Sequence, residues 1–259
     1  MTKYDVLILG GGPGGYVAAT LEKHLKREGI NILTSTKLIS FSHQGVKIEH
    51  KGEEKLIKGD KYLVSLGVKP DLSQVKNLDL EIDEKGFIKT NNKMETSIKG
   101  VYAIGDLNGK NALAHVASAE GIVAAENIMG VESTLNYSIV PQCVYTFPEL
   151  ASVGLTEEVA KERGHDITVS KFPLAANGKA LAEGESLGFI KLISDNQYGE
   201  ILGVHIMAPH ATDMIAEAVA AMQLEGTVYD LAKAIHPHPT LSEIVAEAAF
   251  DAIDRPIHI

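Results

Sequence analysis

The chain has 259 residues, a formal net charge of −10 and one cysteine. Its 45% apolar and 22% charged residues are proportions of a globular protein with a hydrophobic core. The negative charge argues against a nucleic-acid partner, and no apolar run is long enough to span a membrane. A single cysteine excludes an internal disulfide and a cysteine metal cluster, and we predict no metal site. We therefore expect a cytoplasmic protein of one or two domains, without a signal peptide.

The first twenty residues predict the start of a dinucleotide-binding βαβ unit. The apolar run Val6–Leu9 has the length of a buried strand. Gly10, Gly12 and Gly15 follow in G-x-G-x-x-G spacing, and a helix can open at Tyr16. In such a unit the glycines allow a tight turn, close approach of a pyrophosphate and close packing of helix on strand. The alternative is a glycine-rich turn with a purely structural role.

The segment after this helix departs from the dinucleotide-binding pattern. The helix is predicted to continue to about Glu28, with Gly29 as its stop, and Ile30–Leu33 is the candidate second strand. A dinucleotide site needs an acidic residue at the end of that strand, where it binds the ribose hydroxyls. Here Thr34–Thr36 contains no acid, so the adenosine end of the site is incomplete.

A small antiparallel element is predicted over residues 45–66. Apolar and charged residues alternate from Val46, which predicts a strand. Residues 51–54 are expected to make a turn, and Leu56 and Ile57 to lie on the returning strand. Tyr62–Leu66 reads as a further strand, and residues 70–81 read as a loop.

Val101–Ile104 is the next predicted strand, and Gly105 and Asp106 follow it directly. The end of a strand is the usual place for a ligand in an α/β sheet, although a simple Gly-Asp turn explains the pair equally. A helix rich in alanine is predicted over His115–Met129, with Gly130 as its C-cap.

The second half of the chain changes character from about Leu135. The patterns predict a helix capped by Thr156, a hairpin with strands at Phe189–Ile193 and Ile201–Ile206, an amphipathic helix at Thr212–Glu225, and a capping box formed by Thr227 and Asp230. The apolar stripe of the amphipathic helix is typical of core or of a subunit interface.

The last informative stretch is HPHPTLSE, residues 236–243. Thr240 and Glu243 have the spacing of a capping box for a helix through Ala252, which gives Glu243 a structural explanation. His238 lies between prolines, and histidine is the natural proton shuttle near neutral pH. From spacing alone, a chemical and a structural role for His238 both stay open.

Together these stretches resemble the dihydrolipoamide dehydrogenase family of FAD-dependent pyridine nucleotide-disulfide oxidoreductases. DVLILGGGPGGYVAA resembles its FAD pyrophosphate loop, VYAIGD its second FAD motif, LAHVASAEG its flavin-ring segment, and HPHPTLSE its catalytic base motif. PQCVYTFPELASVGLTEE resembles the start of its dimerisation domain. The resemblance implies that His238 is the base and Glu243 orients it. The cofactor-binding residues that it implies are Gly10, Gly12, Pro13, Gly14, Gly15, Gly105, Asp106, Leu113, Ala114 and His115.

The resemblance also implies the fold class and the assembly. We expect an α/β plus α+β architecture, in which a truncated Rossmann-like FAD-binding domain precedes an α+β dimerisation domain. Residues 1–20 and 67–134 would form the FAD-binding domain, 21–66 a remnant of the NAD-binding domain, and 135–259 the dimerisation domain. The family forms homodimers, oxidises dihydrolipoamide with NAD through FAD, and docks on the acyltransferase of 2-oxo-acid dehydrogenase complexes.

Two family features are missing from this sequence. The family has a C-x4-C redox pair after its first helix and a second G-x-G-x-x-G for NAD, whereas this chain has only Cys143 and no second motif. The simplest account is a large internal deletion between Thr20 and Leu21. We therefore expect weak or absent FAD and no activity of the chain alone. One alternative is a non-catalytic module for dimerisation or docking. Another is a different flavin reductase, which no specific residue supports.

Overall fold

The computed structural model of the chain describes residues 3–9 and 15–258. The chain divides into two compact units, Met1–Leu135 and Asn136–Ile259. Throughout the described ranges, every helix is too short or too polar to cross a membrane.

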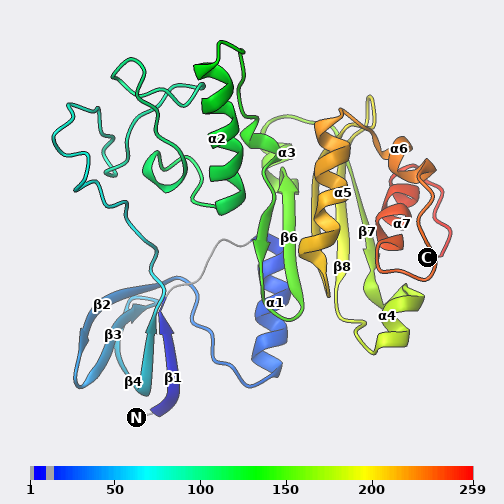
Figure 1. The fold of residues 1–259 in the computed structure, drawn as a ribbon. Coiled ribbons are helices and arrows are strands. Elements are labelled where there is room, and N and C mark those ends of the chain that lie inside the picture. Colours follow the sequence, from blue (N-terminus) through cyan, green and yellow to red (C-terminus); the bar gives the residue numbers. More distant parts are fainter. Residues whose placement is uncertain (1–2, 10–14, 259) are drawn as a thin grey trace. The chain divides into compact units, whose positions relative to one another are not determined.

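The first unit contains a four-stranded sheet with strand order β1-β4-β3-β2 (Figure 1). The long strand β4 (Glu53–Val64) forms its centre. Residues 53–57 of β4 pair antiparallel with β3 (Gly45–His50), and residues 58–64 pair parallel with β1 (Lys3–Leu9). The predicted return strand and the predicted strand Tyr62–Leu66 are therefore parts of one element.

The predicted second strand, Ile30–Leu33, is wrong. Helix α1 (Gly15–Arg27) ends one residue before the expected Glu28, and residues 30–34 are irregular. The Ile30 N–H returns to the Leu25 carbonyl at 3.0 Å, and the Ile30 side chain is exposed. The strand here is β2 (Thr36–Ser42), which pairs with β3 through a tight turn. Such a local hairpin closes a short loop, which costs less chain entropy than a distant pairing.

Val101–Ile104 is not a strand either. Its backbone bonds go to the neighbouring loop: the Ala103 N–H donates to the Met94 carbonyl, and the Thr96 N–H donates to the Val101 carbonyl. A single bridge between Glu95 and Tyr102 is all that forms. Pairing within ten residues satisfies the backbone without a sheet. The turn η1 (Gly105–Leu107) and helix α2 (Ala114–Ile128) follow. The predicted helix is confirmed, but its C-cap is Met129, and Gly130, at φ +83°, is the residue after the cap.

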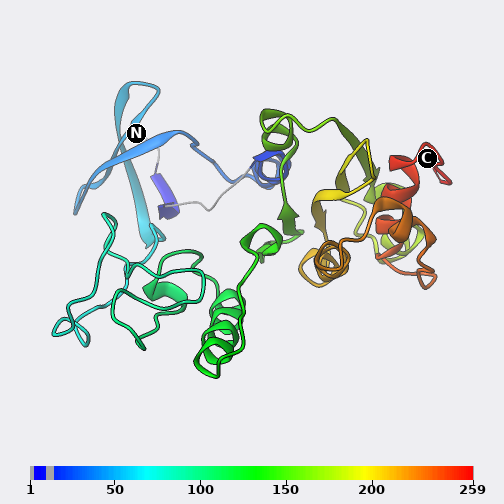
Figure 2. The ribbon, with the colours of Figure 1, turned by 90° about the horizontal axis from the view of Figure 1, so that it is seen from above.

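The second unit is a five-stranded antiparallel sheet with order β5-β6-β9-β8-β7 and helices packed on it. Figures 1 and 2 show α5 and α7, orange and red, beside the yellow strands. The strands are β5 (Gln142–Val144), β6 (Glu149–Gly154), β7 (Ile167–Pro173), β8 (Phe189–Asp195) and β9 (Ile201–Ala208). The helices are α3 (Glu157–Glu162), α4 (Gly178–Glu183), α5 (Ala211–Gln223), α6 (Val228–Lys233) and α7 (Glu243–Ala252), with 3₁₀ turns η2 (Tyr137–Ile139) and η3 (Leu174–Ala176).

Strands β8 and β9 are buried on both faces, because helices cover each side. Leu192 and Ile201 belong to the core shared with α5 and α7, whereas the next residues along each strand, Ile193 and Leu202, pack with Ala160 of α3. The predicted hairpin and the Thr156 cap are confirmed. The stripe of α5 is core at Met214, Ile215 and Ala218, and Thr227 and Asp230 form the predicted capping box.

An ion-pair network joins α3 to the sheet and makes the free energy of unfolding depend on pH in the acidic range. Hydrogen bonds from Lys161 and from the buried Lys191 lower the pKa of Glu157 from 4.5 to about 2. A carboxyl whose pKa is depressed on folding stabilises the fold above its unfolded pKa, and this stabilisation disappears as the pH falls toward the folded pKa. We expect the urea midpoint to fall between about pH 5 and pH 2. Glu157→Gln should flatten this pH dependence, and an unchanged slope would contradict the assignment.

Candidate functional site

The predicted pair His238 and Glu243 comes together where the loop between α6 and α7 meets α7: His238 lies in the loop, and Glu243 is the first residue of α7. The His238 Nδ1 lies 2.8 Å from Glu243 Oε1, and the imidazole side chain is 78% exposed. The other carboxylate oxygen, Oε2, accepts the Thr240 N–H at 2.8 Å. Burial acts to raise the pKa of Glu243, but the hydrogen bonds from Thr240 and His238 outweigh it and lower that pKa. Glu243 is therefore an anionic acceptor fixed from two sides.

The predicted capping box at Thr240 forms only in part. The Glu243 side chain does reach back to the Thr240 N–H, but the Thr240 hydroxyl donates to the Pro237 carbonyl at 2.7 Å. The N-cap position of α7 belongs to Ser242 instead. The prolines beside His238 keep the loop out of helical geometry, so the Thr240 hydroxyl finds a loop carbonyl rather than an N–H of the first turn.

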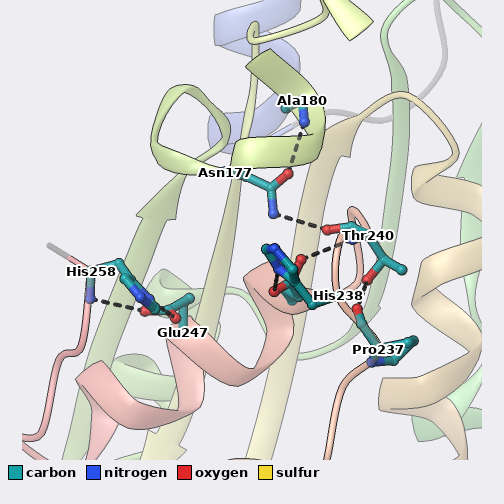
Figure 3. A network of polar contacts seen from close by, with 8 residues as sticks. Asn177, Ala180, Pro237, His238, Thr240, Glu247 and His258 are labelled. Atoms are coloured by element: carbon teal, nitrogen blue, oxygen red, sulfur yellow. Dashed lines mark hydrogen bonds and ion pairs between the residues drawn. The ribbon is translucent and has the colours of Figure 1, made fainter. Parts of the chain in front are cut away.

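Asn177 holds this loop from a distant part of the unit, as Figure 3 shows. Its side-chain Nδ2 donates to the Thr240 carbonyl at 3.0 Å, while its Oδ1 accepts the Ala180 N–H at the start of α4. Sequence reasoning missed Asn177, because 63 residues separate it from Thr240. The only local signal was a cap residue before a glycine, which predicts a helix start and not a loop contact.

Two further histidine–glutamate pairs lie among the described residues of the same unit, besides a looser contact of 3.7 Å between His210 and Asp213. His236 Nε2 is 2.7 Å from Glu217 Oε1 on α5, and His258 Nδ1 is 2.6 Å from Glu247 Oε1 on α7. The His258–Glu247 pair is visible beside His238 in Figure 3. The sequence pattern indicates no role for these four residues, because their spacings of 19 and 11 residues match no local motif.

The His238 pair has the arrangement of a general base. Because the carboxylate accepts a hydrogen bond from Nδ1–H, the neutral ring has its lone pair on Nε2. Nε2 has no partner among the described residues, and the side chain is open to solvent. A proton taken up at Nε2 creates an imidazolium, which the carboxylate stabilises. In the described ranges no group of three or more His, Cys, Asp or Glu side chains is placed to hold a metal ion.

The residues predicted at the second FAD motif and at the flavin-ring segment lie in the first unit. Gly105 is at φ +63°, and an added Cβ there would lie 3.0 Å from the Ala117 Cβ, so glycine allows η1 to lie against α2. Asp106 is exposed on η1. Leu113 is the N-cap of α2, and the first two helical residues, Ala114 and His115, are exposed.

A buried carboxylate that the sequence did not reveal holds this motif in place. Glu120 of α2 is 0% exposed. Its Oε2 accepts the Gly105 N–H at 2.6 Å and the Asn108 side-chain Nδ2 at 2.9 Å. Glu120 therefore ties both ends of η1 to the helix that follows it, and this fixes the backbone that carries Asp106.

The glycine-rich turn is largely outside the described residues. Gly10, Gly12, Pro13 and Gly14 lie there, and Gly15 is the first residue of α1. Residues 30–33 form no second strand, and no acid occupies positions 34–36 where ribose hydroxyls would be bound.

Two family profiles match the chain, and together they cover most of it. Residues 17–121 match the pyridine nucleotide-disulphide oxidoreductase profile, and residues 140–249 match the dimerisation domain of the same family. The dihydrolipoyl dehydrogenase of Bacillus subtilis is 41% identical over 251 residues, which are 93% of this chain and 53% of that protein. The enzyme of the same name from Thermus scotoductus is 43% identical, over 93% of this chain and 54% of its own length. The chain spans about half the length of these curated relatives.

Two solved structures superpose well on the chain. LpdA from Mycobacterium tuberculosis superposes with a TM-score of 0.81 and 26% identity, over 91% of this chain and 52% of that one. The HOCl-induced flavoprotein disulfide reductase RclA from Escherichia coli superposes with a TM-score of 0.82 at 22% identity, over 94% of this chain and 64% of RclA. At that identity the second likeness concerns the fold alone. Both support the expected α/β plus α+β class.

Proposed function

Because the chain belongs to the pyridine nucleotide-disulphide oxidoreductase family, we propose that it carries the proton-accepting part of dihydrolipoyl dehydrogenase chemistry. In the complete reaction, dihydrolipoamide is oxidised with NAD through FAD. The observation that carries the proposal is the His238–Glu243 pair, whose 2.8 Å contact leaves Nε2 open to solvent. Dihydrolipoyl dehydrogenase is also the name of the curated relatives.

The proposed step is proton transfer from a substrate thiol. His238 Nε2 accepts the proton of one dihydrolipoamide thiol, and Glu243 stabilises the imidazolium that forms. The resulting thiolate is the nucleophile that attacks a disulfide, and one sulfur of that disulfide leaves as a thiolate. With Cys143 as its one cysteine, the chain cannot itself provide this disulfide. The electron acceptor must therefore come from outside the 259 residues.

Flavin binding is proposed to be weak or absent. Gly10–Gly15, Gly105, Asp106 and Leu113–His115 are the residues that would approach FAD, but the second strand and the ribose-binding acid are missing. The NAD motif is absent from the sequence as well.

Residues 135–259 are proposed to form the dimerisation domain, residues 1–20 and 67–134 the truncated FAD-binding domain, and 21–66 the NAD-domain remnant. In a homodimer His238 would serve the partner subunit. Tyr145 and Phe147, which follow β5, are exposed, and exposed aromatic side chains favour an interface. The same observation favours the second candidate, a non-catalytic module for dimerisation or for docking on an acyltransferase.

Three measurements on the purified chain test these proposals. We expect no NADH formation with dihydrolipoamide and NAD, a dimer in sedimentation velocity, and flavin absorbance well below one FAD per chain. NADH formation at a rate typical of an enzyme would contradict the proposal that the chain lacks the disulfide needed for turnover. A monomer would contradict the dimerisation domain, and a yellow protein with stoichiometric FAD would contradict the incomplete flavin site.

A further inference from the structure

His236 differs from the other two histidines that are paired with a glutamate, because both of its ring nitrogens make hydrogen bonds. Nε2 lies 2.7 Å from Glu217 Oε1, and Nδ1 lies 3.1 Å from the Ala234 carbonyl. Its side chain is 8% exposed, whereas the side chains of His238 and His258 are largely in solvent. Within the described residues, the imidazole rings of His238 and His258 make hydrogen bonds through Nδ1 alone.

The partners of His236 determine its protonation state. A carboxylate oxygen and a backbone carbonyl only accept hydrogen bonds, so each contact requires an N–H on the ring. A neutral imidazole has one N–H and would leave a lone pair facing an acceptor. Only the imidazolium, with both nitrogens protonated, satisfies both contacts.

The charges around His236 favour that state. Glu217 faces it from α5, and the charge of Glu243 acts on it from α7. The Ala234 carbonyl lies just beyond α6, where helix carbonyls lack partners and cations are stabilised. The hydrogen bond with Glu217 raises the pKa of His236, against the opposing effect of burial.

We propose that His236 is a positively charged positioning residue that ties the segment before His238 to Glu217 on α5 and thereby sets the orientation of the His238 ring. The role assigned to His238 rests on the proposed function, whereas the positioning is a statement about geometry. Only Pro237 separates the two histidines. On the other side, the Thr240 hydroxyl holds the Pro237 carbonyl, and Asn177 holds the Thr240 carbonyl.

This arrangement anchors the His238 loop at both ends. Loss of the His236–Glu217 contact gives the His238 ring more conformations. The contact between His238 Nδ1 and Glu243 is then made for a smaller fraction of the time. The expected signature is a change in the tautomer balance of His238, not only a loss of stability. A merely structural role for Glu217 would leave that balance unchanged.

Histidine ¹⁵N NMR on the full chain tests the proposal. In the unmodified chain we expect His236 to show two protonated nitrogens at pH 7, and neutral His238 to carry its proton mainly on Nδ1. In Glu217→Gln the pKa of His236 should fall, because the carboxylate whose hydrogen bond raises it has been removed. The neutral His238 ring should then shift toward a mixture of the two tautomers. Glu225→Gln, just past the end of α5, is the matched control and should change neither signal.

Two results would overturn the proposal. A neutral His236 at pH 7 in the unmodified chain would refute the charge, and an unchanged His238 spectrum in a folded Glu217→Gln chain would refute the positioning. If Glu217→Gln does not fold, Glu217→Asp replaces it, because a shorter carboxylate keeps the charge but shifts the anchor. The NMR measurement needs no flavin, dithiol or turnover. The positioning role of His236 can therefore be refuted while the proposed function holds, and the proposed function can be refuted while the positioning role holds.

Discussion

His238→Gln is expected to lower the rate of dihydrolipoamide oxidation by about 10²–10⁴-fold in a chain to which the segment proposed to be missing has been added. The completed chain would carry, at the deletion proposed between Thr20 and Leu21, residues of the Bacillus subtilis relative that lie outside the 53% of its length matched by this chain. Glutamine preserves much of the size and polarity of the ring but cannot accept a proton near neutral pH. Only the small fraction of thiolate already present in solution would then react.

NADH absorbance measures this effect, and two companion variants make it specific. Glu243→Gln should reduce the rate less than His238→Gln, because it removes the orienting charge but leaves the base in place. His258→Gln is the matched control, since His258 is also an exposed histidine paired with a glutamate of α7, and it should leave the rate unchanged. A His238→Gln rate within a factor of three of the parent would reject His238 as the base.

Glu120→Ala is expected to destabilise the first unit by about 3 kcal/mol. The side chain is completely buried, and its removal leaves the Gly105 N–H and the Asn108 amide without the acceptor that both now share. An unsatisfied buried donor costs about 1–3 kcal/mol, and more when its lost partner was charged. Glu120→Gln keeps an acceptor oxygen and should cost about 1 kcal/mol.

Hydrogen exchange at the Gly105 amide, together with urea unfolding of the chain, measures the loss. The Gly105 amide should exchange about a hundredfold faster in Glu120→Ala if it exchanges by opening of this unit. Glu126→Ala, six residues further along the same helix, is the control, and its effect should stay within about 0.5 kcal/mol. Equal effects of the two substitutions would show that Glu120 contributes only helix propensity.

The predictions that held depend on hydrogen bonds between residues close in sequence. The Thr156 cap, the Thr227–Asp230 capping box and the hairpin of β8 and β9 are decided within a few residues, so their patterns were sufficient. The lack of a redox dithiol is likewise a property of the sequence alone, because it requires only a count of cysteines.

Two predicted strands failed because an apolar run specifies burial but not a pairing partner. Ile30–Leu33 has the composition of a strand, but the neighbouring hairpin of β2 and β3 forms the sheet edge instead. Val101–Ile104 has the same composition, and its backbone is satisfied by residues 94–96. Strand formation depends on which segment supplies the opposite row of hydrogen bonds, which a local pattern does not contain.

The histidine motif shows where sequence and tertiary structure divide. The residues 236–243 by themselves placed a histidine and a carboxylate within reach of each other, because His238 and Glu243 are only five positions apart. Only the folded unit brought Asn177 to Thr240 and Glu217 to His236, over separations of 63 and 19 residues. The same holds for Glu120 and Gly105, which are 15 positions apart. Chemistry that is local in the chain can be predicted from it, whereas the contacts that hold such chemistry in place depend on packing between distant elements.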